Sequence, residues 1–99
     1  MPRETTRLDI DPERIRAFED AASRAVPLFR RAPGCIRMDL LRSLEVAGLY
    51  WLPIDWRRVE DHEAFRTSRD FAEWRALVGG FFTSPPAVEH GLAAGIGFS

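Results

Sequence analysis

The sequence predicts an α+β fold in which helices cover one face of an antiparallel sheet. Alternation of polar and apolar residues indicates short strands, whereas apolar residues three and four positions apart indicate helices. These segments follow one another in the order β-α-β-β-α-β, with the second helical segment divided in two. This order is typical of the ferredoxin-like layout, an antiparallel sheet that carries all of its helices on one side.

Composition excludes several classes of protein. The net charge is -1, and the 14 basic residues, all arginine, are spread evenly, so we expect no nucleic-acid partner. No apolar run approaches the roughly 20 residues of a membrane span, and the charged N-terminus does not resemble a signal peptide. A single cysteine, Cys35, excludes an intramolecular disulfide and favours the reducing cytoplasm. We expect one domain over residues 1–99 and no membrane partner.

The first half of the chain predicts one helix and three strands. Thr5–Ile10 alternates as a short strand, and Asp11-Pro12 resembles a helix start, with an N-cap carboxylate before a proline. Apolar residues then keep helical spacing for about four turns, with a kink expected at Pro27. The next two strands are expected at Cys35–Leu41 and Leu49–Trp56.

The pattern of the second and third strands predicts which side chains face the helices. In the second strand these are Ile36, Met38 and Leu40. In the third they are Tyr50, Leu52, Ile54 and Trp56. Pro53 lies inside the third strand and has no N–H to donate, so we expect an edge or a bulge there.

An aromatic-rich stretch, residues 62–82, carries five of the eleven aromatic residues. It predicts a helix over Val59–Arg66 and a second helix after a break at Thr67-Ser68, where either residue can act as the cap. Gly79-Gly80 is expected to stop the second helix with a left-handed glycine. A last strand is expected at Val88–Leu92.

The sheet face opposite the helices has no segment left to cover it. That face would carry Arg7, Asp9, Arg37, Asp39, Leu49, Trp51 and Asp55. Arg7, Asp9, Arg37 and Asp39 could bind a carboxylate substrate, but they are expected to pair across strands or with a second copy of the chain. Because Trp51 is too apolar for a solvated face, we expect a homodimer.

The chain resembles the antibiotic biosynthesis monooxygenase family over roughly Asp11 to His90. The most specific matching residues are Trp56, His62, Phe65, Ser68, Phe71, Trp74, Phe82 and Pro85. The resemblance implies a dimeric α+β barrel, in which the last strand often reaches across to the partner. Arg58 and Gly91 depart from the family pattern, which has Ser or Asp at the first position and an aromatic residue at the second.

The resemblance implies two alternative functions. One is a cofactor-independent monooxygenase that oxidises a small aromatic, such as a phenol, a hydroquinone or a polyketide, with O2. The other is a non-catalytic dimeric domain that binds a hydrophobic ligand or assists a pathway. Haem-degrading members carry Trp and His where this chain has Phe65 and Arg75, which cannot ligate haem iron. The two histidines and Cys35 lack the spacing of metal ligands, so no cofactor or metal is expected.

His62 is the candidate catalytic residue, because histidine titrates near neutral pH and can accept or orient a phenolic proton. The alternative is a structural histidine that hydrogen-bonds to the backbone beside Trp56. The aromatic residues that could bind a flat substrate are Tyr50, Trp56, Phe65, Trp74 and Phe82. Plain packing in the core is the alternative for the Trp and Phe residues, and is favoured for Phe71 and Trp74. For Tyr50 the alternative is a strand residue with its hydroxyl at the surface. His90, on the last strand or its connector, is expected to lie apart from this group.

Overall fold

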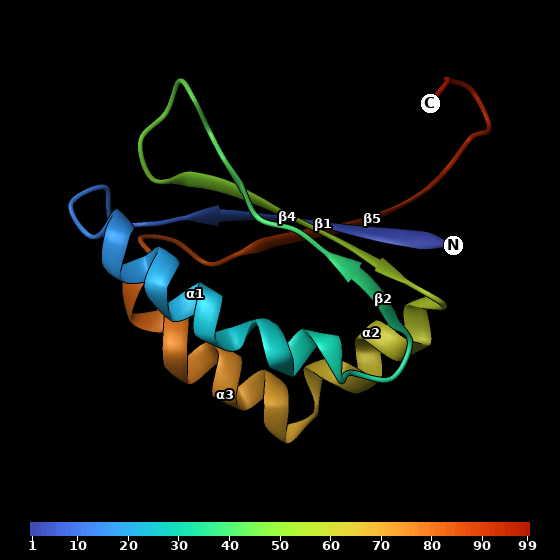
Figure 1. The fold of residues 1–99 in the computed structure, drawn as a ribbon, viewed down its shortest axis with the longest axis horizontal. Helices are drawn as coiled ribbons and strands as arrows, with labels where there is room; N and C mark the ends of the chain where they lie inside the picture. The colour runs from blue at the N-terminus through green and yellow to red at the C-terminus, as the bar shows by residue number, and fades with distance from the viewer.

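The computed structural model describes all of residues 1–99 and has the predicted α+β arrangement. The strands are β1 (Pro2–Asp9), β2 (Cys35–Met38), β3 (Leu41–Arg42), β4 (Leu49–Trp56) and β5 (Ala87–Leu92). The helices are α1 (Ile15–Arg30), α2 (Val59–Arg66) and α3 (Arg69–Val78), with a 3₁₀ turn at Gly79–Phe81. All three helices lie on one face of the sheet (Figure 1). None of them is long and apolar enough to cross a membrane.

The sheet has the ferredoxin-like strand order β2-β4-β1-β5, and every pairing is antiparallel. Strand β3 pairs with the same edge of β4 as β2 does. The predicted fold class is therefore confirmed. Strand β1 lies between β4 and β5, and this register places Glu4 opposite both Ile54 and His90.

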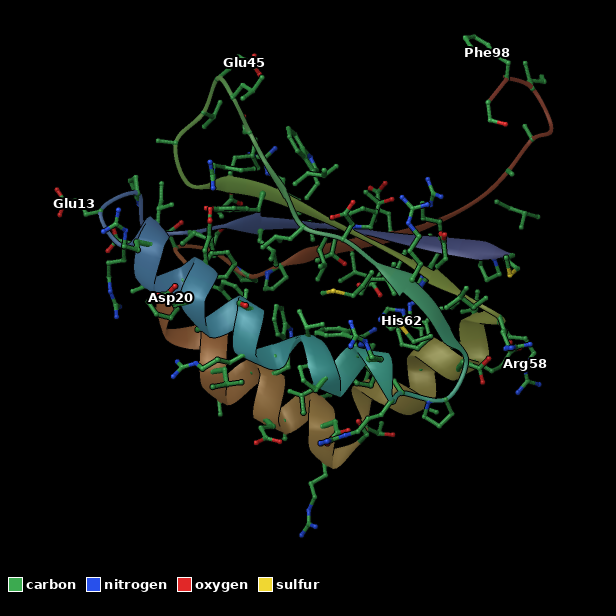
Figure 2. The ribbon with its side chains drawn as sticks, in the orientation of Figure 1. Glu13, Asp20, Glu45, Arg58, His62 and Phe98 are labelled. Atoms are coloured by element: carbon green, nitrogen blue, oxygen red, sulfur yellow. The ribbon has the colours of Figure 1, made fainter.

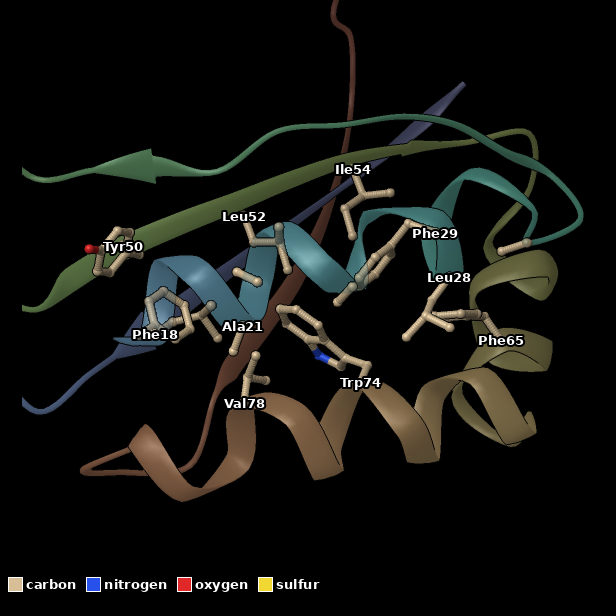
Figure 3. Close-up of a cluster of buried hydrophobic side chains, with 14 of the residues drawn as sticks. Phe18, Ala21, Leu28, Phe29, Tyr50, Leu52, Ile54, Phe65, Trp74 and Val78 are labelled. Atoms are coloured by element: carbon tan, nitrogen blue, oxygen red, sulfur yellow. The ribbon is translucent and has the colours of Figure 1, made fainter. Parts of the chain in front are cut away.

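A hydrophobic core joins the helices to the sheet (Figure 3). Helix α1 contributes Phe18, Ala21, Ala22, Ala25, Leu28 and Phe29, and β4 contributes Tyr50, Leu52, Ile54 and Trp56. The ring of Phe29 packs edge-on against Trp74 of α3 and tilted against Phe65 of α2, with centroids 5.0 and 5.1 Å away. Helix α1 thus positions both of the shorter helices.

Helix α1 starts later than the sequence predicts. Asp11 does not cap it, because its Oδ1 atom accepts a hydrogen bond from the backbone N–H of Glu13 at 3.0 Å and closes a turn instead. A short polar side chain that bonds its own backbone competes with helix formation in this way. The helix begins at Ile15 and continues through Pro27 to Arg30.

The predicted strand Cys35–Leu41 is interrupted, since β2 ends at Met38 and β3 begins at Leu41. A register shift between Cys35 and Arg37 breaks the alternation of side chains. As a result Ile36 is 45% exposed, although the pattern predicted its burial. An irregularity of one residue moves a strand side chain from one face to the other.

Pro53 lies within β4, which is a central strand and not an edge. Its carbonyl oxygen accepts a hydrogen bond from the N–H of Asp39 at 3.0 Å, so its nitrogen also faces the β2–β3 side. Asp39 lies in the interruption between β2 and β3. The irregularity expected for a proline is therefore in the neighbouring strand.

Helix α3 begins as predicted but ends differently. The Ser68 hydroxyl accepts a hydrogen bond from the N–H of Phe71 at 3.2 Å, which confirms Ser68 as the cap. Gly79 has a φ of −59°, so the predicted left-handed glycine is wrong. The chain tightens into the 3₁₀ turn instead, and the N–H of Phe82 donates to the carbonyl of Gly79 at 3.3 Å.

The sheet face opposite the helices has no helix over it (Figure 1). Trp51 is 37% exposed on this face, and Arg3 of β1 pairs with Asp55 of β4 at 2.7 Å. Leu49 is the exception, because it is only 7% exposed at the base of the loop that joins β3 to β4. Beyond β5, residues 93–99 extend away from the sheet and are exposed.

Candidate active site

His62 lies on α2 and faces the sheet, where it is 3% exposed (Figure 2). Helix α2 carries Glu60 and Asp61 in its first turn, where the helix dipole favours negative charge. His62 and Phe65 are the two buried residues of this helix, and their spacing of three places them on one face. The helix therefore directs an imidazole and a phenyl ring towards the sheet together.

A buried carboxylate, Glu4, holds His62 from the sheet side. The Oε1 atom of Glu4 lies 3.1 Å from Nε2 of His62 and accepts a hydrogen bond from Nε1 of Trp56 at 3.0 Å. The hydroxyl of Thr6 donates to Oε2. Glu4 is 5% exposed, and its carboxylate therefore depends on these three partners instead of water.

Sequence reasoning missed Glu4, although a signal was present. Glu4, Thr6 and Leu8 alternate along β1 and are all buried. The predicted strand began at Thr5, one residue too late to include the carboxylate. An alternation extended towards the N-terminus would have placed Glu4 on the same face as Leu8.

His90 also belongs to this group, and the prediction that it lies apart from His62 is wrong. Its Nε2 atom lies 2.7 Å from Nδ1 of His62. The reason is the pairing of β5 with β1, which sets His90 directly opposite Glu4. Residues at the two ends of the chain thus meet at one imidazole.

The surroundings of His62 favour the neutral form of its ring and one tautomer of that form. Burial lowers the pKa of His62; Glu4 opposes this shift, whereas His90 and Arg66 add to it. A neutral imidazole has one N–H, and a carboxylate only accepts hydrogen bonds, so we assign the hydrogen to Nε2, facing Glu4. Nδ1 then accepts from His90, which gives a continuous chain of hydrogen bonds from His90 to His62 to Glu4.

Trp56 fixes the plane of this imidazole. The two rings are stacked, with centroids 5.2 Å apart and an interplanar angle of 18°. Trp56 is fully buried, and its indole N–H is held by Glu4. Stacking and hydrogen bonding together leave His62 one orientation, as a pre-organised site requires.

A cavity of about 120 Å³ lies beside His62, between the sheet and the helix pair α2–α3. Its polar wall consists of Glu4, Thr6 and His62, and two arginines, Arg66 and Arg75, also line it. The remaining wall is apolar: Leu8, Phe29, Leu52, Phe65, Phe71, Trp74, Pro86 and Val88. A protein cavity of about 150 Å³ holds benzene, so this slightly smaller space has room for no more than one aromatic ring.

The structure separates the predicted substrate-binding residues. Phe65 and Trp74 line the cavity, and Trp56 lies behind His62. Phe82 does not line it; its backbone forms an isolated bridge with Ile10, and its side chain packs against the core. Tyr50 does not line it either; it lines a second hollow of about 380 Å³ between α1 and the β2–β4 edge, and Trp74 and Leu52 lie in the walls of both.

The hydroxyl of Tyr50 belongs to a different hydrogen-bonded group, which includes Glu19 and Arg42. It donates to Glu19, which also pairs with Arg42 at 2.7 Å. Burial and the adjacent carboxylate raise the pKa of Tyr50 to about 12, so the phenol stays protonated at neutral pH. Burial likewise raises the pKa of Cys35 to about 11, which disfavours the thiolate that nucleophilic chemistry needs.

Glu4, His62 and His90 make contact in a line and do not surround a common point. No group of three His, Cys, Asp or Glu side chains has the arrangement of metal ligands. What this arrangement can do chemically is move a proton. The basic atom is Nδ1 of His62, while Glu4 can stabilise the cation that forms when this atom is protonated.

The fold and the cavity define a small α+β domain with room for one ring between its sheet and its helices. The model of the family "Antibiotic biosynthesis monooxygenase" matches residues 1–77. The chain belongs to this family, which confirms the resemblance noted in its sequence.

Relatives match nearly the whole chain in sequence or in fold. YczJ of Bacillus subtilis (strain 168), an uncharacterized protein, is 38% identical over 91 residues, covering 91% of this chain and 96% of YczJ. A crystal structure from Bordetella bronchiseptica that carries the family name is 41% identical, with a TM-score of 0.90 over 94% of this chain and 96% of its own. SnoaB, a cofactor-independent oxygenase from Streptomyces nogalater, has a TM-score of 0.77 over 94% and 92% of the two chains. At 19% identity, its likeness shows the fold alone.

Proposed function

We propose that this protein is a cofactor-independent monooxygenase that oxidises a small phenol or hydroquinone with O2. The observation that carries the proposal is a buried His62 in the wall of a cavity with room for one aromatic ring. Membership of a monooxygenase family supports it, and so does the fold shared with a cofactor-independent oxygenase. A three-ring polyketide would exceed the cavity, so we favour single-ring substrates.

The proposed reaction needs no external reductant. The phenol gives its proton to His62, and the phenolate passes one electron to O2, which forms superoxide and a phenoxyl radical. These recombine at a ring carbon that is ortho or para to the oxygen and bears a hydrogen, and the peroxide takes a proton. Cleavage of its O–O bond, with loss of the hydrogen on that carbon, leaves one oxygen in a quinone and releases the other as water. The protein supplies orientation, exclusion of water and a proton acceptor.

Two neighbours of His62 complete the proposed mechanism. The substrate hydroxyl takes the place of His90 at Nδ1, the only basic atom of the buried imidazole. Glu4, at Nε2, then stabilises the imidazolium that forms. His90 lies on the exposed strand β5 and can carry the proton from Nδ1 to solvent.

The second candidate function is a non-catalytic ligand-binding domain. One observation favours it: both nitrogens of His62 already have partners, and the ring stacks on Trp56. In that case the network is structural, and it holds β1, α2 and β5 together. The cavity would then bind a hydrophobic ring without changing it.

We further propose a homodimer, with residues 1–99 as a single domain in the cytoplasm. Domains of this family are typically dimeric. The uncovered sheet face with Trp51, the wholly exposed edge strand β5 and the exposed Phe98 of the tail support the dimer. The lone cysteine, Cys35, supports the compartment.

Oxygen consumption tests the function. The wild-type protein should consume O2 with at least one member of a panel of phenols and hydroquinones, without added flavin or metal and in the presence of a chelator. Since a positioned general base contributes about 10²–10⁴-fold, His62→Gln should lower kcat by that order. Tyr50→Phe is the matched control, because Tyr50 lies in a different hollow and should leave kcat unchanged.

Melting temperatures of both variants separate lost chemistry from lost folding. A folded His62→Gln protein with full turnover would remove His62 from the mechanism. Ligand binding without O2 consumption across the whole panel would favour the non-catalytic function.

A further inference from the structure

Two arginines line the cavity and contribute to no step of the proposed mechanism. Arg66 lies four residues beyond His62 on α2, and Arg75 lies four residues beyond Phe71 on α3. A spacing of four keeps each arginine on the face of its helix that borders the cavity. Both are exposed, whereas His62 is buried, so the guanidinium groups mark the solvent end of the cavity.

Neither of these arginines has an ion-pair partner. Five other arginines do pair with carboxylates: Arg3, Arg7, Arg31, Arg42 and Arg58. The only carboxylate that lines the cavity is Glu4, and its oxygens already engage Trp56, Thr6 and His62. Within the ion-pair distance, no carboxylate therefore pairs with the two guanidinium groups at the solvent end of the cavity.

The wall between the two polar ends of the cavity is largely apolar. Phe65 and Trp74 line it, and its volume of about 120 Å³ admits one ring. Four helical residues rise about 6 Å from His62 to Arg66, which is close to the span of a benzene ring with substituents at opposite ends. A ligand that reaches both ends needs a hydroxyl on one side and an anion on the other.

We infer that the cavity binds a single aromatic ring that carries a hydroxyl group at one end and a carboxylate, or a similar anion, at the other. The hydroxyl lies at His62 and the anion at Arg66 and Arg75, whose forked donors match a planar carboxylate. The role of the hydroxyl rests on the proposed function. The preference for an anion rests on the two arginines alone.

Binding without O2 tests this preference separately from catalysis. Calorimetric titrations under argon compare 4-hydroxybenzoate with 4-hydroxybenzamide, a neutral analogue of nearly the same shape. Charge-assisted hydrogen bonds predict that the acid binds about 10–100-fold more tightly than the amide. Arg66→Met and Arg75→Met should each reduce this ratio, and the double variant should abolish it.

Arg69→Met is the matched control, since Arg69 is an exposed arginine of α3 that does not line the cavity. It should keep the wild-type ratio, and melting curves should show that all variants fold. Equal affinities for acid and amide would overturn the inference, as would a preference that survives in the double variant or a lack of binding by both probes. Selective binding without O2 consumption on any phenol would leave this inference intact and reject the oxygenase.

Discussion

Replacing Glu4 by leucine tests the buried network on which the site depends. The change removes the acceptor shared by Trp56, Thr6 and His62. The Thr6 hydroxyl can rotate to another acceptor, and His62 can move its proton to Nδ1 and face His90 instead. The indole N–H of Trp56 has no such choice, because the ring is fully buried and stacked on His62.

The expected loss of stability comes from this one donor, the indole N–H, which is left without an acceptor. A buried donor without a partner destabilises a protein by about 1–3 kcal/mol, so Glu4→Leu should lower the free energy of unfolding by about that amount. Glu4→Gln should cost less, because its amide oxygen can still accept from Trp56. Urea denaturation, monitored by circular dichroism, measures the stability of both variants. The chain concentration is kept fixed, because the midpoint of a dimer's unfolding depends on concentration.

A double-mutant cycle shows whether the loss of stability comes from the unpaired indole N–H of Trp56. In a Trp56→Phe background there is no indole N–H to strand, so Glu4→Leu should cost clearly less there. An equal cost in both backgrounds would refute the reasoning. So would a Glu4→Leu protein as stable as the wild type to within about 0.5 kcal/mol.

Three further predictions concern pH, assembly and backbone. Burial lowers the pKa of His62 in the folded protein; His90 and Arg66 lower it further, whereas Glu4 opposes the shift. As the pH falls, the imidazole is therefore protonated in the unfolded chain before it is protonated in the folded protein. The stability due to neutral His62 is therefore full above pH ~6.5 and falls with pH towards the folded pKa; thermal melts should show this decline, and less of it in His62→Gln. The wild type should sediment at twice the chain mass. Trp51→Glu should sediment as a monomer or unfold, because it buries an unpaired carboxylate at the proposed contact. A wild-type protein that sediments as a monomer would contradict the proposed dimer. Gly48→Ala should lower the free energy of unfolding, measured by urea denaturation, by about 1–2 kcal/mol. Gly48 has a φ of +86°, and a Cβ atom there would collide with the carbonyl oxygen of Ile10. An unchanged midpoint of denaturation would show that the substitution causes no such strain.

Local patterns predicted the elements that local interactions define. The bounds of β4 agree with prediction because Tyr50 and Trp56 begin and end an uninterrupted alternation. The break before α3 was visible because Ser68 is a strong cap. The start of α1 was missed because Asp11 could either cap a helix or close a turn, and one sequence does not decide between the two.

Half of the histidine network could not be read from local patterns. Alternation along β1 can place Glu4 on the buried face, but it does not identify the partners of Glu4, and His90 looks like a residue of an exposed edge strand. Their roles arise from the pairing of β1 with β5, which joins opposite ends of the chain. The burial of Ile36 was predicted wrongly for a related reason. The register shift beside Ile36 depends on how β2 pairs with β4, which local alternation does not show.

The wide separation of Glu4, Trp56, His62 and His90 along the chain also bears on how the protein folds. Closing loops this long costs conformational entropy before any contact compensates for it, so such pairings form slowly. The segment from β4 to α3 contains Trp56 and His62 and can collapse early, whereas Glu4 and His90 join only when the first and last strands pair. During refolding, the indole hydrogen bond and the contact between the two imidazoles should therefore appear late, after most of the helical signal has returned.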